Sequence, residues 1–371
     1  MKIAYVIPES LNSHPGLKYK VEQQASFWKD SGHQVYLVYL ALGYVEIFGG
    51  ERVREEKMPG YRRFGMLATF ANLSWSYGFA RRVLADIRPN ITYTRYLFPA
   101  RHIHTISEFS GSLICEINSD DRKEFTSNSS FSGRYNAWFR KAFLKQVDGF
   151  VFMTDELRNS KSFSKFHGLA CTIPNGANVD DFPFLERTAN LHPNLVFVGS
   201  PGQSWHGLDK IYWLAKYLGS CKFHIVGPTR QECESVWSDL PENVAFHGYL
   251  SAEKTAEVVA GADVGIGTLA LHRKGMSEAC PLKVRQYLAQ GVPVIAGYKD
   301  PDIQQCCSFY FQISNHEGNV QESFDDIINF IDRVHGNGAI RREARKFAEE
   351  YLSFTAKEER RLSFFERVLS S

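Results

Sequence analysis

The stretch NLVFVG, residues 194–199, is a short apolar run that stops at a glycine. The same design recurs at 222–227, 263–267 and 293–296, with segments of helical length between the runs. Short apolar strands that alternate with helices and end at a glycine are typical of βα units in a parallel sheet. The second half of the chain is therefore predicted to be a doubly wound α/β domain.

The first half of the chain repeats this alternation. Apolar runs at 3–7 and 34–40 flank a loop through Pro15 and Gly16 and a predicted helix over about 19–30. Further runs follow, and all of them predict strands of a second parallel sheet: 91–93, 113–117 and 149–153. The turn PNG at 174–176 and the polar segment 180–193 then interrupt the pattern and predict a linker. Two Rossmann-like domains are expected, at 1–178 and 190–352.

The chain ends in a helical stretch, 339–369. Phe347, Tyr351 and Phe354 recur at helical spacing, and a second such series follows further on. The tetrapeptide TAKE at 355–358 fits a capping box, so two helices are predicted to meet there.

Size and composition bound the class of protein. A chain of 371 residues with 44% hydrophobic and 23% charged residues suits two soluble domains. A net charge of +2 argues against general nucleic-acid binding. The seven cysteines are scattered without metal-ligand spacing, as in a reducing cytosol. No stretch approaches the ~20 apolar residues of a membrane span, and the N-terminus does not resemble a signal peptide. A cytoplasmic protein is expected.

The segment 278–295, EACPLKVRQYLAQGVPVI, carries the clearest chemistry. Pro281 and Gly291 suit the first residue and the C-terminal cap of a helix, which predicts a helix over 281–290. Its N-terminal amides, together with the charge of Lys283, suit a diphosphate. Gln286 lies one turn further along the same face, and Glu278 just precedes the helix. On spacing alone, an ordinary capped helix with a solvated polar face fits equally well.

This segment resembles the signature of glycosyltransferase family 4, which contains retaining enzymes of the GT-B fold. The signature is a Glu, seven residues, a second Glu and a helix that ends in Gly-x-Pro-Val-Ile. By this resemblance Glu278 contacts the donor sugar. Gln286 replaces the second Glu, which binds the ribose hydroxyls, and Gln can still accept one hydrogen bond and donate another. The run 281–283 matches a common variant of the loop.

The resemblance extends over nearly the whole chain. Segment 197–207 is similar to the strand and glycine-rich turn that open the second domain of the family, with Ser200 and His206 near the positions of its Arg and Lys. Arg273 and Lys274 are candidates for the missing positive charge; a solvated surface loop is the alternative, as a structural role is for His206. The turn at 246–250 matches the one that approaches the base, although an ordinary strand end looks the same.

In the first domain, segment 15–19 resembles the loop that approaches the donor, where the alternative for Gly16 is a simple tight turn. Asn118 stands where relatives often have a His near the reacting sugar, and it cannot act as a base. Glu116 is either buried structure or an acceptor contact. Segment 173–178 matches the closing turn of the first domain. The family fold implies two facing domains with a C-terminal helix, about 355–371, that returns to the first.

The resemblance implies transfer of a sugar, with retention, from a UDP-sugar or GDP-sugar to a saccharide or lipid-linked saccharide, in cell-surface polysaccharide synthesis. No metal or cofactor is expected. A sugar-nucleotide-binding relative without activity, or an epimerase or phosphorylase of the same fold, is the alternative. The candidate residues are these: Glu278, Lys283 and Asn118 for catalysis; Gly16, Gly199, Gly202, His206, Gly227, Gly248, Tyr249, Leu250, Arg273, Lys274, Cys280, Leu282 and Gln286 for the donor; Glu116 and Lys18 for the acceptor.

The segment 133–150 combines basic and aromatic residues. Such a helix suits peripheral contact with an anionic, cytoplasmic membrane face that carries a lipid-linked acceptor. The alternative is a packed helix with an exposed basic side. The residues concerned are Arg134, Trp138, Phe139, Arg140, Lys141, Phe143 and Lys145.

Overall fold

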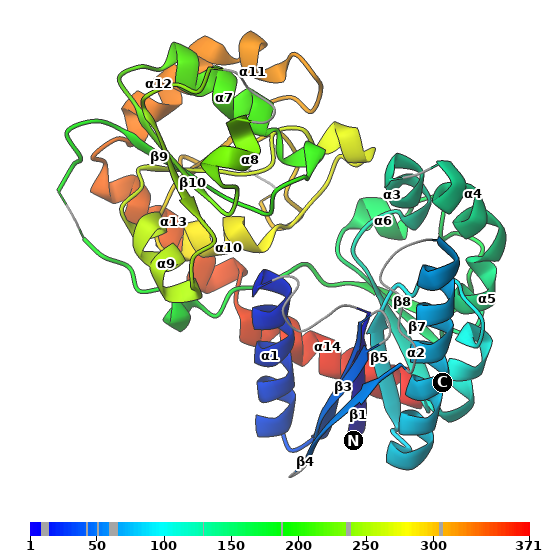
Figure 1. The fold of residues 1–371 in the computed structure, drawn as a ribbon. Helices are drawn as coiled ribbons and strands as arrows, with labels where there is room; N and C mark the ends of the chain where they lie inside the picture. Colours follow the sequence, from blue (N-terminus) through cyan, green and yellow to red (C-terminus); the bar gives the residue numbers. More distant parts are fainter. Residues whose placement is uncertain are drawn as a thin grey trace. The chain divides into compact units, whose positions relative to one another are not determined.

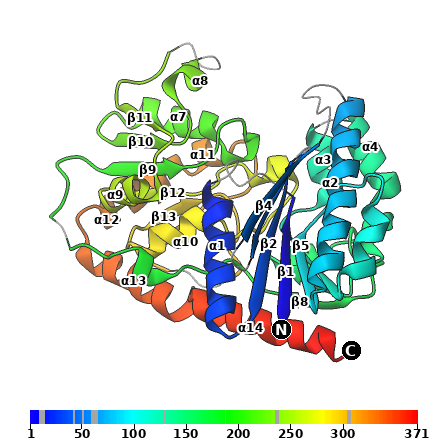
Figure 2. The ribbon, with the colours of Figure 1, turned by 60° about the horizontal axis from the view of Figure 1, so that its bottom comes forward.

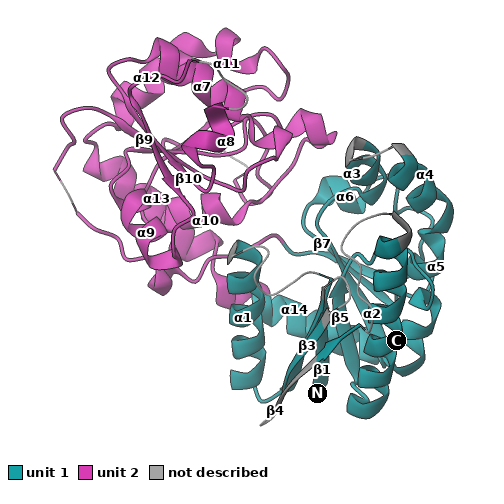
Figure 3. Cartoon of the chain, viewed as in Figure 1, with its two compact units in different colours: residues 1–173, 358–371 teal, residues 174–357 magenta. Residues whose placement is uncertain are grey.

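The computed structural model describes residues 1–8, 15–41, 44–49, 52–58, 66–128, 130–186, 188–234, 239–303 and 307–371. The chain forms two compact units, coloured separately in Figure 3. The first contains Met1–Ile173 and Glu358–Ser371, and the second contains Pro174–Lys357. The segment predicted as a linker belongs to the second unit.

The first unit is built on one sheet of eight described strands in the order β4-β3-β2-β1-β5-β6-β7-β8 (Figure 1). The strands are β1 (Lys2–Ile7), β2 (Gln34–Ala41), β3 (Tyr44–Gly49), β4 (Arg52–Lys57), β5 (Ile91–Arg95), β6 (Ser112–Ile117), β7 (Gly149–Phe152) and β8 (Leu169–Thr172). Six of them pair in parallel, as predicted, and β3 and β4 add an antiparallel hairpin at one edge. The prediction of a fully parallel sheet therefore missed the antiparallel hairpin of β3 and β4, because the sequence signal of this short hairpin is weak.

Helices cover both faces of this sheet, as βα connections require. Trp28 of α1 packs against Tyr5 and Tyr93 of the sheet and is fully buried. The helices, with one 3₁₀ segment, are α1 (Pro15–Asp30), α2 (Met66–Ile87), η1 (Ile103–Phe109), α3 (Asp121–Asn128), α4 (Ser130–Phe139), α5 (Lys141–Leu144) and α6 (Asp155–Arg158). Pro15 and Gly16 thus form the first turn of α1, and the expectation that they lie in a loop is wrong. Proline is favoured in a first helical turn because it has no N–H to leave unpaired.

The second unit is built on six described parallel strands in the order β11-β10-β9-β12-β13-β14. They are β9 (Asn194–Val198), β10 (Lys222–Val226), β11 (Val244–Gly248), β12 (Val264–Ile266), β13 (Val294–Ala296) and β14 (Tyr310–Gln312). Around them lie η2 (Val179–Asp181), η3 (Ser204–His206), α7 (Leu208–Tyr217), α8 (Arg230–Glu234), α9 (Ala252–Ala260), η4 (Leu271–Lys274), α10 (Leu282–Ala289), α11 (Asn319–Glu322), α12 (Phe324–Val334) and α13 (Gly338–Tyr351). The strand order reverses direction at β9 and β12, which makes their carboxyl ends a topological switch point.

The last helix, α14 (Phe354–Leu369), starts in the second unit and continues in the first. Figure 2 shows it beside the first sheet, where Phe365 packs on Trp28 and Tyr93. Two helices do meet near residue 355, but the cap is Ser353, whose hydroxyl accepts from the Ala356 amide at 3.3 Å. Glu358 instead accepts hydrogen bonds from Gln24 and Trp28, both at 3.0 Å.

Among the described residues, no helix is both long and apolar enough to cross a membrane.

Candidate functional site

A row of glycines marks the carboxyl edge of the second sheet. Gly199 follows β9, Gly227 follows β10 and Gly248 ends β11, and their backbones are joined in series. The Gly199 amide bonds to Val226 O at 3.0 Å, and the Gly227 amide bonds to Gly248 O at 2.8 Å. Gly227 has φ +109°, and a Cβ there would lie 1.8 Å from Gly199 O. A side chain at Gly227 would break this edge, so glycine is required for close backbone approach.

The turn after β9 and the loop after β12 are joined at the switch point. The Leu269 and Ala270 amides donate to the carbonyls of His206 and Trp205, each at 3.2 Å. In the turn, Gly202 has φ +73° and a Cβ placed on it would meet no described atom within 4 Å. The turn therefore presents backbone beside open space, a shape suited to a bound polar group.

Helix α10 packs across the ends of β9 and β12. The Tyr287 hydroxyl accepts from the Val198 amide at 2.9 Å, and the Tyr287 ring lies against Gly265. The helix begins at Leu282, with Pro281 at the N-cap, and no described side chain caps it. Pro281 is extended at ψ 141°, so the helix starts one residue later than predicted. Gly291 is left-handed at φ +68°, as expected for the residue after a helix end.

Lys283 lies in the first turn of α10, and its amine is buried. Nζ sits 3.9 Å from the centroid of the Phe197 ring and has no hydrogen-bond partner in the described part of the chain. Burial places the pKa of Lys283 well below its usual value. An unpaired buried amine costs free energy, so its retention points to a ligand that pairs with it.

His206 faces the same place from η3. Its Nδ1 is also buried without a partner among the described residues, and it lies 2.9 Å from the position of a Cβ built on Gly199. Burial, and after it the nearby charges of Lys283 and Lys274, lower the pKa of His206 to about 2. The ring is therefore neutral and can donate one hydrogen bond. Two orphaned polar nitrogens thus lie beside the turn that carries Gly199.

Glu278 is held beside β13 by a backbone bridge to Lys299. Its carboxylate pairs with Lys299 Nζ at 3.0 Å, and its side chain is 13% exposed. The Ala279 amide donates to Lys299 O at 3.1 Å and fixes the loop. Lys299 was missed by sequence reasoning because 21 residues separate it from its partner.

Arg285 holds α10 in place through hydrogen bonds of its buried side chain. Sequence reasoning also missed this residue. It is fully buried, donates to Asn175 O at 2.9 Å, and binds Asp300 through two hydrogen bonds of 2.5 and 2.9 Å. It also pairs with Asp302 at 2.7 Å. Asn175 in turn donates to Cys280 O at 2.8 Å. The loop before the helix is thus tied to a rigid base.

The other donor candidates have varied surroundings. Cys280 is buried and burial raises its pKa to about 11, which makes it an inert thiol. Leu282 is half-buried, and Gln286 donates weakly to Gln290 Oε1 at 3.3 Å. Tyr249 is exposed and Leu250 half-buried at the end of β11.

Arg273 does not offer a free charge. It pairs with Asp209 at 2.7 Å and also with Glu317, so two carboxylates already balance it. Lys274 Nζ lies 4.6 Å from the centroid of the Trp205 ring. Lys283 and His206 therefore remain as the groups directed at an anion.

The candidate site residues of the first unit differ in burial and in their partners. Asn118 is half-buried at the carboxyl end of β6, Gly16 is exposed and Lys18 lies 3.9 Å from Glu22. Glu116 is fully buried, bonded to Lys20 at 2.7 Å and to Tyr93 at 2.6 Å. An acceptor contact at Glu116 is therefore wrong, and the buried alternative holds.

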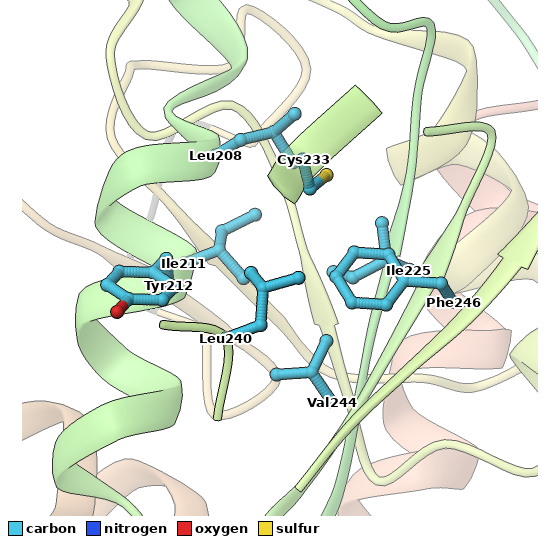
Figure 4. Close-up of a pocket in the computed structure, with 8 residues that line it drawn as sticks. All are labelled: Leu208, Ile211, Tyr212, Ile225, Cys233, Leu240, Val244 and Phe246. Atoms are coloured by element: carbon cyan, nitrogen blue, oxygen red, sulfur yellow. The ribbon is translucent and has the colours of Figure 1, made fainter. Parts of the chain in front are cut away.

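A cavity in the second unit lies away from these groups, under α7 and α8 (Figure 4). Its lining is almost wholly apolar and carries no charge, which does not suit a nucleotide. It consists of Leu208, Ile211, Tyr212, Ile225, Cys233, Leu240, Val244 and Phe246. No group of three or more His, Cys, Asp or Glu side chains in the described residues could hold a metal.

Comparison with solved structures identifies the architecture. The whole chain matches sucrose-phosphate synthase from Thermosynechococcus elongatus with a TM-score of 0.77 and 13% identity, over 100% of this chain and 99% of that one. The catalytic domain of starch synthase IV from Arabidopsis thaliana, bound to ADP and acarbose, matches with a TM-score of 0.69 and 11% identity over 100% of both chains. The fold is GT-B.

A third match is HepE of Anabaena in complex with UDP-glucose, with a TM-score of 0.63, 11% identity and coverage of 100% and 99%. Residues 192–307 match the family model of group 1 glycosyl transferases. No curated protein matches the sequence. The fold and the matched domain together support a glycosyltransferase of the GT-B type.

Proposed function

We propose that this protein transfers a sugar from a nucleotide diphosphate-sugar to a saccharide or lipid-linked saccharide. The observation that carries the proposal is the pair of orphaned nitrogens, Lys283 Nζ and His206 Nδ1, beside the glycine turn after β9. A diphosphate offers the acceptor oxygens that both nitrogens lack. Relatives of the same fold are described in complex with UDP-glucose and with ADP.

The order of groups on α10 supports a direction for the donor. Lys283 and the uncapped helix N-terminus would hold the diphosphate, and Gln286, one turn on, would hold the ribose. Glu278 would bind the sugar hydroxyls, with its carboxylate oriented by Lys299. This arrangement fits a family 4 enzyme in which Gln replaces the second Glu.

Catalysis would come from stabilisation of the leaving group. As the bond to the sugar breaks, negative charge develops on the diphosphate, and preorganised donors there lower the barrier. The charge would also favour the protonated form of Lys283. We propose retention, with the leaving phosphate taking the acceptor proton, since the candidate residues include no suitably placed base. A hexose donor and a role in cell-surface polysaccharide synthesis belong to the same proposal.

The decisive experiment measures nucleotide binding and nucleotide release on matched variants. Lys283→Ala and Glu278→Ala are compared with Lys216→Ala, an exposed lysine of α7. We expect Lys283→Ala to weaken UDP or GDP binding at least tenfold, since a charge-assisted contact is worth about 1.5–3 kcal/mol. Glu278→Ala should retain nucleotide binding but lose sugar transfer. Wild-type binding and transfer in both variants would overturn the site.

The same assay separates the alternatives. An epimerase of this fold converts the nucleotide-sugar into its epimer without an acceptor, whereas a transferase releases free nucleotide only when an acceptor is present. A binding protein without activity holds the donor and releases nothing, and Gln286→Glu would not give it activity.

A further inference from the structure

The surface of α4 and α5 in the first unit carries aromatic side chains that the fold does not bury. Trp138 is 73% exposed, Phe131 49% and Phe139 47%. Large aromatic residues normally lie in a core or an interface. Three exposed ones on one short stretch therefore indicate a surface that binds another molecule or phase. We call this surface the α4–α5 patch, defined by Phe131, Arg134, Trp138, Phe139, Lys141 and Lys145.

The helix geometry brings these residues to one side. Arg140, between α4 and α5, keeps right-handed helical angles, φ −53° and ψ −29°. Its amide donates to Asn136 O at 2.8 Å, and its carbonyl accepts from the Phe143 and Leu144 amides at 3.2 and 3.1 Å. At 100° per residue, the six residues of the α4–α5 patch fall in an arc of about 160°. The three aromatic residues occupy one part of this arc and the three basic residues the other.

The opposite side of the same stretch packs into the unit. Phe143 is fully buried, and Arg140 forms a buried ion pair with Asp121 at 2.5 Å. Arg140 and Phe143 therefore do not belong to any surface, which corrects the sequence interpretation. Tyr135 connects the two sides. The centroid of its ring lies 4.6 Å from that of Phe70 in α2 and 4.7 Å from that of Phe139.

The charge of the α4–α5 patch has one sign. Segment 125–147 contains no Asp or Glu, although the whole chain has a net charge of only +2. In the described part of the chain, Arg134, Lys141 and Lys145 have no carboxylate within ion-pair distance. The nearest acidic groups in sequence are engaged: Asp121 with Arg140, Glu124 with Ser119, and Asp148 with the Leu113 amide.

We infer that the α4–α5 patch docks the protein on an anionic lipid surface. Exposed Trp and Phe insert at the level of the headgroups, and flanking Lys and Arg pair with anionic lipids. The surface belongs to the first unit and involves none of the proposed donor groups, so it stands or falls separately from the proposed transfer activity.

The test uses the full-length protein and vesicles of phosphatidylcholine alone or with 30% phosphatidylglycerol. We expect flotation with the anionic vesicles only, and release by high salt. Trp138→Ala with Phe139→Ala should lower the partition coefficient at least tenfold, and so should Lys141→Glu with Lys145→Glu. Lys216→Glu with Lys222→Glu is the charge-matched control on exposed sites of the second unit and should bind normally.

A second readout locates the contact. Brominated lipid should quench tryptophan fluorescence in the wild type, and Trp138→Phe should lose most of that quenching while it still floats. Absence of flotation, equal loss in the control variant, binding to duplex DNA in place of vesicles, or a dimer broken by the Trp138 and Phe139 changes would each overturn the proposal. Unchanged circular dichroism spectra and thermal unfolding midpoints in the variants of the α4–α5 patch show that they are folded.

Discussion

Lys283 shows how one residue can oppose folding and favour binding. Its amine is buried above the Phe197 ring and finds no acceptor within the described structure. In the unfolded chain the same amine is hydrated and protonated at neutral pH. Folding must therefore remove a proton or bury a charge, and both cost free energy.

We predict that Lys283→Met raises the free energy of unfolding by about 1–3 kcal/mol at pH 7 while it weakens donor binding at least tenfold. Methionine packs well on an aromatic ring and has no charge to desolvate. Because the folded pKa of Lys283 is lowered, the unfolded wild type binds more protons, so its stability rises with pH up to about 10.5.

The gain from methionine should accordingly be larger at pH 7 than at pH 9, as measured by urea unfolding at both values. Lys216→Met, at an exposed site, supplies the control and should change stability by less than about 0.5 kcal/mol. A destabilised Lys283→Met at pH 7 would mean that the amine has a partner in the folded protein.

At the scale of elements, helix α10 is held in place by contacts with several other segments of the second unit. Arg285 bonds to Asn175 O and to both carboxylates, Asp300 and Asp302, and Tyr287 fastens the helix to β9. Helix α10 therefore has a fixed position relative to the turn after β9. A binding site gains affinity when its groups need no rearrangement.

We predict that Arg285→Lys destabilises the protein by about 3–5 kcal/mol, because lysine cannot bind Asp300 through two parallel hydrogen bonds. Nucleotide affinity should fall as well, since the tie through Asn175 to the Cys280 loop is lost. Chemical unfolding and nucleotide titration measure the two effects. Arg342→Lys makes the same change in an exposed pair with Glu186 and should cost less than about 1 kcal/mol.

At the scale of the whole molecule, a buried polar network joins α14 to the first sheet. Glu116 of β6 is bonded to Lys20 and Tyr93, and Arg361 of α14 lies 3.6 Å from it. Burial alone would raise the pKa of Glu116, but Lys20, Arg361 and the hydrogen bonds outweigh it and lower the pKa to about 2. The network holds the end of the chain on the unit where the chain began.

We predict that Glu116→Gln destabilises the first unit by about 3–5 kcal/mol at pH 7, since Lys20 loses its buried counter-charge and Arg361 is left with Glu358. The folded pKa of Glu116 is depressed, so its contribution is present above pH 4.5 and is lost as the pH falls toward 2. The variant should therefore lose part of the acid sensitivity in that window, as followed by circular dichroism. Glu22→Gln, in a surface pair with Lys18, should behave as the wild type.

The sequence by itself determined the βα alternation, the two sheets and the helix after residue 281. These features depend on local periodicity and on residues such as Gly291, whose left-handed conformation few other residues accept. The motif also directed attention to Lys283 and Glu278, because a position in the first turn of a predicted helix and one just before it are local properties of the sequence.

Only the tertiary structure decided which candidate charges are free. Arg273, Arg140 and Glu116 read as available groups in the sequence, but each is paired with residues 19 to 245 positions away. The counterpart is Lys283, which the sequence places near a helix N-terminus, whereas only the structure shows that its amine is buried without a partner among the described residues. Burial and pairing depend on contacts between distant segments, so local sequence patterns do not contain them, and here they separate a ligand-directed charge from a structural one.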